Sequence, residues 1–252
     1  MRTIGHAGAV NNDGGLPVMA EGAGEADGAG EAGGFAETGD GDRRGWWRVL
    51  GSAVVAGLVF GPVDLAVQKL LPYPFADLGN SMAVWALGAF LFGAWVGTGR
   101  LRPIAGAATF NLVAVESYYL AATLVQHDAI GNLWATSTLL FLFAAVVAGL
   151  VFGLGGALAR SGPGWQRLVG AALPGAVFLA EAGIRFTQGH GDPDAGYRRD
   201  RFEDALMYAI IALVLGLVIG RGARGRWQGL AVSVTLAVPG FVALKLFVGG
   251  SA

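Results

Sequence analysis

The sequence predicts an all-α fold, namely a polytopic transmembrane helix bundle of about seven spans preceded by a disordered N-terminal tail. Three observations lead to this prediction. The chain is 54% hydrophobic and only 14% charged, with a mean hydropathy of +0.55, whereas soluble domains carry about 25% charged residues. Seven apolar segments follow one another over residues 46–250, each near the ~20 residues that cross ~30 Å of hydrocarbon. Residues 1–45 contain no such segment.

The expected tail, residues 1–45, is rich in Gly, Ala and Glu and has no apolar periodicity. Such a segment cannot bury enough apolar surface to offset the entropy that it loses on ordering, so we expect it to be disordered. Arg2 is followed by small and acidic residues rather than by an apolar stretch, so we expect no cleavable signal peptide. An acidic interaction arm is the alternative interpretation of this tail.

The transmembrane domain is expected to occupy residues 46–250. Its seven predicted spans cover about residues 49–71, 79–98, 103–125, 130–158, 168–186, 202–220 and 230–248. Buried helices of a soluble protein are the alternative interpretation. So many apolar helices would leave almost no polar surface to face water, which favours the membrane.

Arginine placement predicts the orientation. One side of the bundle receives most of the basic residues: Arg43, Arg44, Arg48, Arg100, Arg102, Arg160, Arg167, Arg221, Arg224 and Arg226. By the positive-inside rule that side is cytoplasmic, so we expect the N-terminus in the cytoplasm and, for an odd number of helices, the C-terminus outside. The connection between the fifth and sixth spans disagrees, because it carries Arg198, Arg199 and Arg201 on the outer side.

Four Gly-x-x-x-Gly pairs predict how the spans pack, because two glycines one turn apart let helix backbones approach closely in lipid. The pairs are Gly57 with Gly61, Gly93 with Gly97, Gly149 with Gly153, and Gly216 with Gly220. We expect them to pack helices within one chain. Oligomerisation through the same glycines is the less favoured alternative.

Three segments and the small-residue helices that follow them carry a resemblance to a known family. The segments are Leu71-Pro-Tyr-Pro, Leu78-Gly-Asn-Ser-Met-Ala-Val-Trp85 and Ala89-Phe-Leu-Phe-Gly93. With these features the chain resembles an actinobacterial family of multi-pass membrane proteins. That family is a domain of unknown function. The resemblance covers roughly residues 49–248 and leaves out the tail. It implies a bacterial plasma membrane and brings with it no activity, cofactor or site residues.

Polar side chains inside the predicted spans are the candidate functional residues, because an ionised group at membrane depth is costly unless it is paired or wetted. A rise of ~1.5 Å per residue places several of them at one level in the outer half of the bundle. This predicted polar cluster consists of Asp64, Gln68, Asn80, Glu116, Tyr119, Glu181, Arg185 and Lys245.

Two interpretations of this cluster remain open. In the structural one, Glu181 pairs with Arg185 and Lys245 pairs with Glu116 or Asp64, so that the charges hold the bundle in register. In the functional one, surplus carboxylates bind a proton or a cation and couple it to a solute. The leading hypothesis is therefore a transporter of a small solute or ion. The alternative is a non-catalytic membrane scaffold or regulatory subunit.

The sequence predicts no enzyme. The absence of cysteine excludes thiolate catalysis and Cys-based metal sites. The three histidines, His6, His127 and His190, lie in the tail and in outer loops, so we expect no Ser–His centre within the spans. We likewise expect no catalytic residue, metal site, cofactor or nucleic-acid partner, the last because a net charge of −1 provides no basic stripe. The expected partners are the lipid bilayer and a small solute or cation.

Overall fold

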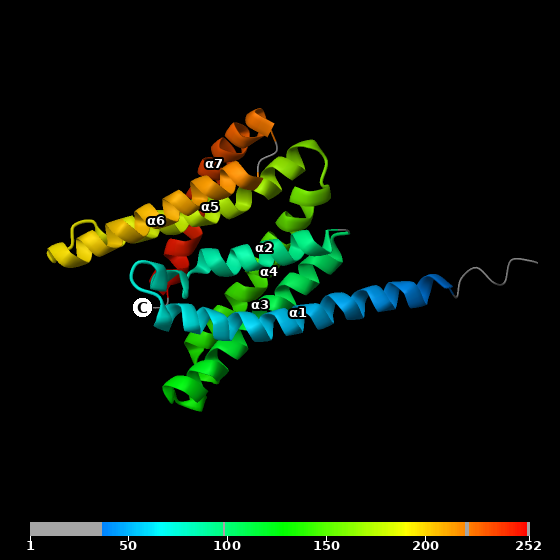
Figure 1. Cartoon of the computed structure of the whole chain (residues 1–252), viewed down its shortest axis with the longest axis horizontal. Helices are drawn as coiled ribbons and strands as arrows, with labels where there is room; N and C mark the ends of the chain where they lie inside the picture. Colours follow the sequence, from blue (N-terminus) through cyan, green and yellow to red (C-terminus); the bar gives the residue numbers. More distant parts are fainter. Residues whose placement is uncertain (1–36, 98, 220–221, 251–252) are drawn as a thin grey trace, which may run out of the picture. The chain divides into compact units, whose positions relative to one another are not determined.

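The computed structural model describes residues 37–97, 99–219 and 222–250 (Figure 1). They form seven α-helices: α1 (Glu37–Leu70), α2 (Met82–Val96), α3 (Leu101–Gln126), α4 (Thr136–Ser161), α5 (Gly164–Gly189), α6 (Ala195–Ile219) and α7 (Gly222–Gly250). Short 3₁₀ turns, η1 (Phe75–Leu78) and η2 (Ile130–Trp134), precede α2 and α4. No strand occurs within these ranges, so the all-α prediction is confirmed.

Most of the expected tail, residues 1–36, lies outside the described residues, and its predicted disorder stays a prediction. Helix α1 begins at Glu37, so the last part of the predicted tail, up to Gly45, is helical. This start could not be expected from the sequence, because Gly39, Gly41 and Gly45 are poor helix formers.

Six helices are long and apolar enough to cross a membrane, namely α1 from Gly45 onward and α3 to α7. The protein is therefore a membrane-embedded helical bundle. Two predicted spans need correction. The second, residues 79–98, contains only the 15-residue α2. The fourth, residues 130–158, contains η2 and then α4 from Thr136, because Thr138 Oγ1 donates to Asn132 O at 2.5 Å and closes a separate turn.

Helix α2 is short because its first turn begins inside the protein. Ser81 is its N-cap, is completely buried, and accepts a hydrogen bond from Val84 N at 3.2 Å. At the other end Gly97 adopts a left-handed conformation, with φ of 69°, and Arg160 Nη1 donates to Ala94 O at 3.0 Å. The protein thus supplies hydrogen-bond partners at both ends of α2.

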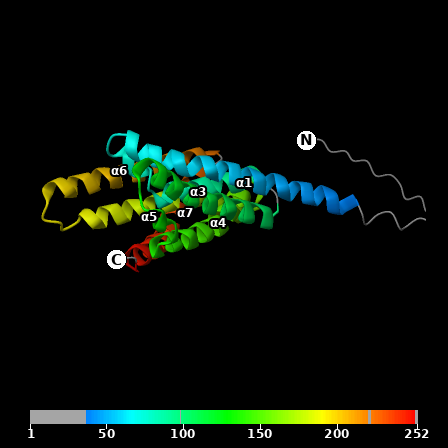
Figure 2. The ribbon, with the colours of Figure 1, turned by 90° about the horizontal axis from the view of Figure 1, so that it is seen from below.

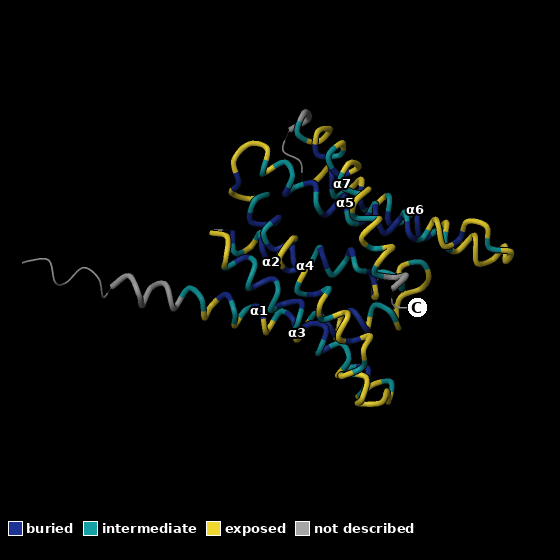
Figure 3. The backbone as a smooth tube through the Cα atoms, turned by 180° about the vertical axis from the view of Figure 1, so that it is seen from behind, coloured by how far each residue is buried: buried dark blue, intermediate teal, exposed yellow. Residues whose placement is uncertain are grey.

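The helices α2 to α7 pack in two groups. Helices α2, α3 and α4 form one group, α5, α6 and α7 form the other, and the groups meet where α4 packs on α5. Helices α5 and α6 run side by side (Figures 1 and 2), and α7 packs along α5. Helix α4 packs on α2, α3 and α5. Stacked rings of Phe92 and Phe110, 5.8 Å apart, join α2 to α3, and Phe178 and Tyr208, also 5.8 Å apart, join α5 to α6. Figure 3 shows the buried positions along the facing sides of these helices.

The Gly-x-x-x-Gly glycines lie where the chain's own helices meet. Gly57 and Gly61 face α3, Gly93 faces Gly153 of α4, and Gly149 faces Ala108 of α3. A methyl group at any of these positions would overlap backbone atoms of the neighbouring helix. Packing within one chain is therefore confirmed for these glycines, whereas Gly220 lies outside the described residues.

Candidate functional site

The eight residues of the predicted polar cluster separate into groups. They are Glu181 with Arg185, Asp64 with Gln68, Asn80 with Tyr119, and Glu116 and Lys245 each by itself. The shared level that the sequence predicts does not bring all eight into one site, because the helices turn some of them away from each other.

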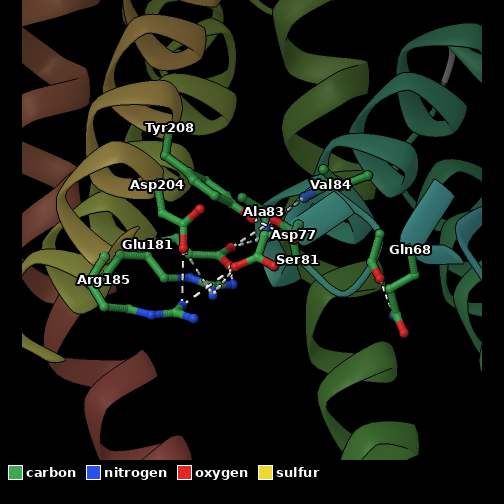
Figure 4. A network of polar contacts seen from close by, with 11 residues as sticks. Gln68, Asp77, Ser81, Ala83, Val84, Glu181, Arg185, Asp204 and Tyr208 are labelled. Carbon is green, nitrogen blue, oxygen red and sulfur yellow. Dashed lines mark hydrogen bonds and ion pairs between the residues drawn. The ribbon is translucent and has the colours of Figure 1, made fainter. Parts of the chain in front are cut away.

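Arg185 is the centre of a partly buried ion-pair network, in which Glu181 and Asp204 are the buried members (Figure 4). Its Nη2 lies 3.1 Å from Glu181 Oε1, and its Nη1 lies 3.2 Å from Asp77 Oδ2 and 3.9 Å from Asp204 Oδ2. The guanidinium also lies over the ring of Tyr208, 5.5 Å from its centroid. The predicted pairing of Glu181 with Arg185 is confirmed.

A second guanidinium completes this network. Arg201 Nη1 lies 3.0 Å from Asp204 Oδ2 and 3.5 Å from Asp77 Oδ2. Tyr208 Oη donates to the backbone carbonyl of Asp77 at 2.9 Å. Arg201 is one of the three arginines that disagree with the predicted orientation, and it pairs with these carboxylates.

Glu181 also holds the start of α2. The residue is buried. Its Oε2 accepts hydrogen bonds from Ser81 Oγ at 2.9 Å and from Ala83 N at 2.8 Å. A carboxylate is favourable there, because the first N–H groups of a helix are unpaired and carry partial positive charge. Glu181 therefore ties α5 to the buried end of α2.

Asp64 and Gln68 form a separate polar group between α1, α2 and α3. Asp64 is 5% exposed, and its Oδ2 accepts a hydrogen bond from Trp85 Nε1 at 3.3 Å. Over the described ranges it has no ion-pair partner. One turn further on, Gln68 Nε2 donates to Tyr118 Oη at 3.2 Å and to the carbonyl of Gly79. In Figure 4, Gln68 lies apart from the ion pairs.

A cavity of about 540 Å³ lies between α2, α3, α4, α5 and α7. Trp85 and Tyr118, whose rings meet edge to face with centroids 6.3 Å apart, stand between this cavity and the Asp64 group. Asn80 and Tyr119 also line it. None of the described residues that line the cavity is charged. Its size lies within the ~300–1,000 Å³ of small-molecule sites.

Glu116 and Lys245 are not part of either polar group. The Lys245 ammonium lies 5.8 Å from the ring centroid of Phe241 on its own helix, and the side chain is exposed. Glu116 is half-buried and has no hydrogen bond or ion pair in the part of the chain that the structure describes. The predicted pairing of Lys245 with Glu116 or Asp64 is therefore wrong. Helix α7 contacts α5 through Gly240 and Phe241, whereas Lys245, one turn further on, is exposed.

Six residues that the predicted cluster lacks are central to the two groups: Asp77, Trp85, Tyr118, Arg201, Asp204 and Tyr208. Asp77 and Arg201 lie outside the predicted spans, so a search for charges at membrane depth misses them. The three aromatic residues resemble ordinary apolar positions in a sequence.

Residues 40–250 match the DUF6518 family, which is described as a family of unknown function. The chain belongs to the DUF6518 family. The match includes every residue of the ion-pair network, the Asp64 group and the cavity, and it agrees with the domain of unknown function that the sequence resembles. No curated protein and no solved structure matches this DUF6518 chain.

Proposed function

We propose that this protein is a plasma-membrane transporter of a small uncharged solute, that Asp64 carries a coupled proton, and that it has no catalytic step. One observation carries the proposal. Trp85 lines the uncharged cavity and also donates a hydrogen bond to the buried carboxylate of Asp64. Transporter sites lie within helix bundles and place a solute beside the group that binds the coupling ion.

Asp64 has the chemistry that proton coupling needs. A carboxylate at membrane depth is a typical member of a proton relay, and it normally faces a partner or a cavity. Here the described residues offer Asp64 one donor, Trp85 Nε1, and no cation. A solute that displaces Trp85 removes this donor from Asp64. Conversely, a proton on Asp64 removes the negative charge that accepts the hydrogen bond from Trp85 Nε1. Because coupling between two sites is reciprocal, either event would favour the other.

We also propose that the basic side of the bundle is cytoplasmic, with the N-terminus inside and the C-terminus outside. The Arg102 guanidinium lies 5.8 Å from the Trp46 ring centroid, and Arg160 caps α2. These contacts support the proposal that basic and indole side chains lie at the same edge of the membrane, as is usual for the cytoplasmic side. A reporter that works only outside the cytoplasm should be active when fused after Ala252. Activity of a cytoplasmic reporter there would reverse the orientation.

A non-catalytic membrane scaffold or regulatory subunit is the second candidate. The observation that favours it is the ion-pair network, in which Glu181 and Arg185 each contact fixed partners and stabilise the bundle. A scaffold would need this network but would need neither the cavity nor the unpaired carboxylate. The two functions therefore differ in what they require of Asp64.

Proton movement driven by a solute tests the proposal. The purified protein would be reconstituted in liposomes that enclose a pH-sensitive dye, and a panel of neutral alcohols and amides would be added outside. We expect at least one of them to change the internal pH with wild-type protein. Asp64→Asn should reduce that signal to the level of protein-free liposomes, because the amide cannot carry a proton.

Asp192→Asn is the matched control, because Asp192 lies in the connection between α5 and α6, away from the cavity. It should transport like the wild type. If no solute of the panel moves protons, or if Asp64→Asn moves them as the wild type does, the scaffold is the better account.

A further inference from the structure

The uncharged cavity changes in polarity along its length. Near the start of α2 and the last part of α3 its wall carries Asn80, Tyr118 and Tyr119. Further along α4 and α5 the wall is apolar, with Val151, Phe152, Leu173 and Val177 among its residues. A molecule that fits both parts must have one polar end and an apolar body.

The apolar part of the cavity opens toward the outside of the bundle between α4 and α7. Both helices pack on α5, and the rings of Phe141 and Phe247, with centroids 6.1 Å apart, join them near one end of the cavity. Phe143 and Val151 line the cavity although 66% and 46% of their surface is exposed. In a membrane-embedded bundle, exposed apolar side chains of this kind contact lipid tails. Once the bundle is embedded in a membrane, this side of the cavity would face the hydrocarbon of the bilayer.

Inside the cavity wall one polar group lacks a partner. Asn111 of α3 is completely buried, and its Nδ2 donates to Ala145 O of α4 at 3.3 Å, but its Oδ1 accepts no hydrogen bond from the described residues. A buried acceptor without a partner is costly, and a bound donor would remove that cost. Because no charged side chain of the described lining faces the cavity, an ionised ligand would find no counter-charge there.

We propose that the cavity binds an uncharged, single-chain amphiphile drawn from the bilayer, with its chain between α4 and α7 and a hydroxyl or N–H donor bound to Asn111 Oδ1. This inference names the class of solute for the transport proposed above. Its role in transport rests on that proposed function. Binding itself requires only the cavity. A long-chain alcohol and a glycerol monoester are members of the class, whereas a fatty acid anion is not.

Photolabelling in lipid nanodiscs tests this assignment without any transport step. The probe is dodecanol with a diazirine in its chain, and the charged comparison probe is an alkyl sulfonate of the same length with the same diazirine. We expect the alcohol to label peptides of α4 and α7, and an excess of plain dodecanol to suppress that labelling. The sulfonate should give no labelling that dodecanol suppresses.

Three variants locate the site. Ala148→Phe fills the cavity and should abolish the suppressible labelling. Asn111→Leu removes the acceptor at nearly constant volume and should weaken dodecanol about two- to ten-fold, the range for one net hydrogen bond. Val214→Phe enlarges an exposed position of α6 outside the cavity and should label like the wild type.

Each other outcome counts against the proposal. Labelling that excess dodecanol does not suppress, or that persists in Ala148→Phe, would overturn the cavity as the binding site. Equal suppressible labelling by the sulfonate would overturn the uncharged class, and an unchanged affinity in Asn111→Leu would overturn Asn111 as the anchor. Because this experiment reads binding alone, it can fail while solute-driven proton movement succeeds, and the reverse also holds.

Discussion

Replacing Arg185 by Leu is expected to reduce the free energy of unfolding by about 3–5 kcal/mol, the usual cost of removing one partner from a buried ion pair. Arg185 faces Glu181, Asp77 and Asp204, so its loss leaves three carboxylates opposite the single guanidinium of Arg201. Replacing Glu181 by Leu should cost less. Arg185 then keeps Asp77 and Asp204, although Ser81 Oγ and Ala83 N lose their acceptor.

A double-mutant cycle on Glu181 and Arg185, read from unfolding in mixed detergent, measures their direct interaction. We expect the double Leu variant to be more stable than the sum of the single losses predicts, by about 0.5–3 kcal/mol. The control is the exposed pair of Arg199 with Glu203, 2.8 Å apart, where Arg199→Gln should have no measurable effect. An Arg185→Leu variant as stable as Arg199→Gln would show that the network does not hold the bundle.

Adding a single methyl group at Gly156 should cost about 4 kcal/mol or more and abolish most of the folded yield. A Cβ at Gly156 of α4 would overlap Phe90 O and would lie 2.6 Å from Ala94 N of α2. Both are backbone atoms, so relief requires that the two helices separate. Gly93→Ala should behave in the same way, because its Cβ would overlap the backbone of Gly153. The measurement is the yield of monodisperse protein in detergent together with its melting temperature.

Gly51 and Gly229 are the matched controls. An added methyl group at either position meets no atom within 4 Å. In an open helical position Gly→Ala stabilises by about 0.4–1 kcal/mol, because alanine has less freedom to lose on folding. The substitution should therefore have opposite signs at the two kinds of position. Loss of yield at all four glycines would mean that helix contacts are not the cause.

The helices could be predicted from the sequence because apolar length is a local property, whereas helix ends and rotations depend on neighbours. The spacing of four residues between Glu181 and Arg185 predicts their pairing, since such residues share one helix face. The late start of the helix in the second predicted span could not be predicted. Met82 begins α2 because Glu181, far away in the sequence, accepts from its first turn.

Level and rotation are different quantities, and only the level follows from counting residues. Lys245 is exposed and lies over the ring of Phe241 on its own helix rather than beside a carboxylate. The cavity could not be predicted either, because its lining comes from five helices and consists mostly of ordinary apolar residues. Asn80 and Tyr119 of the predicted cluster line it, and Asn111 was a further signal, as an amide within an apolar span must find partners inside the bundle.

The central claim is that Trp85 couples the cavity to Asp64, and Trp85→Phe tests it most directly. Phenylalanine keeps a ring against Phe60 and Tyr118, whose centroids lie 5.5 and 6.3 Å from that of Trp85, but it removes the Nε1 donor to Asp64. The measurement is the number of protons moved per solute molecule in liposomes. We predict that Trp85→Phe still binds and moves solute while its proton movement falls to the protein-free level. An unchanged ratio of protons to solute would contradict the claim.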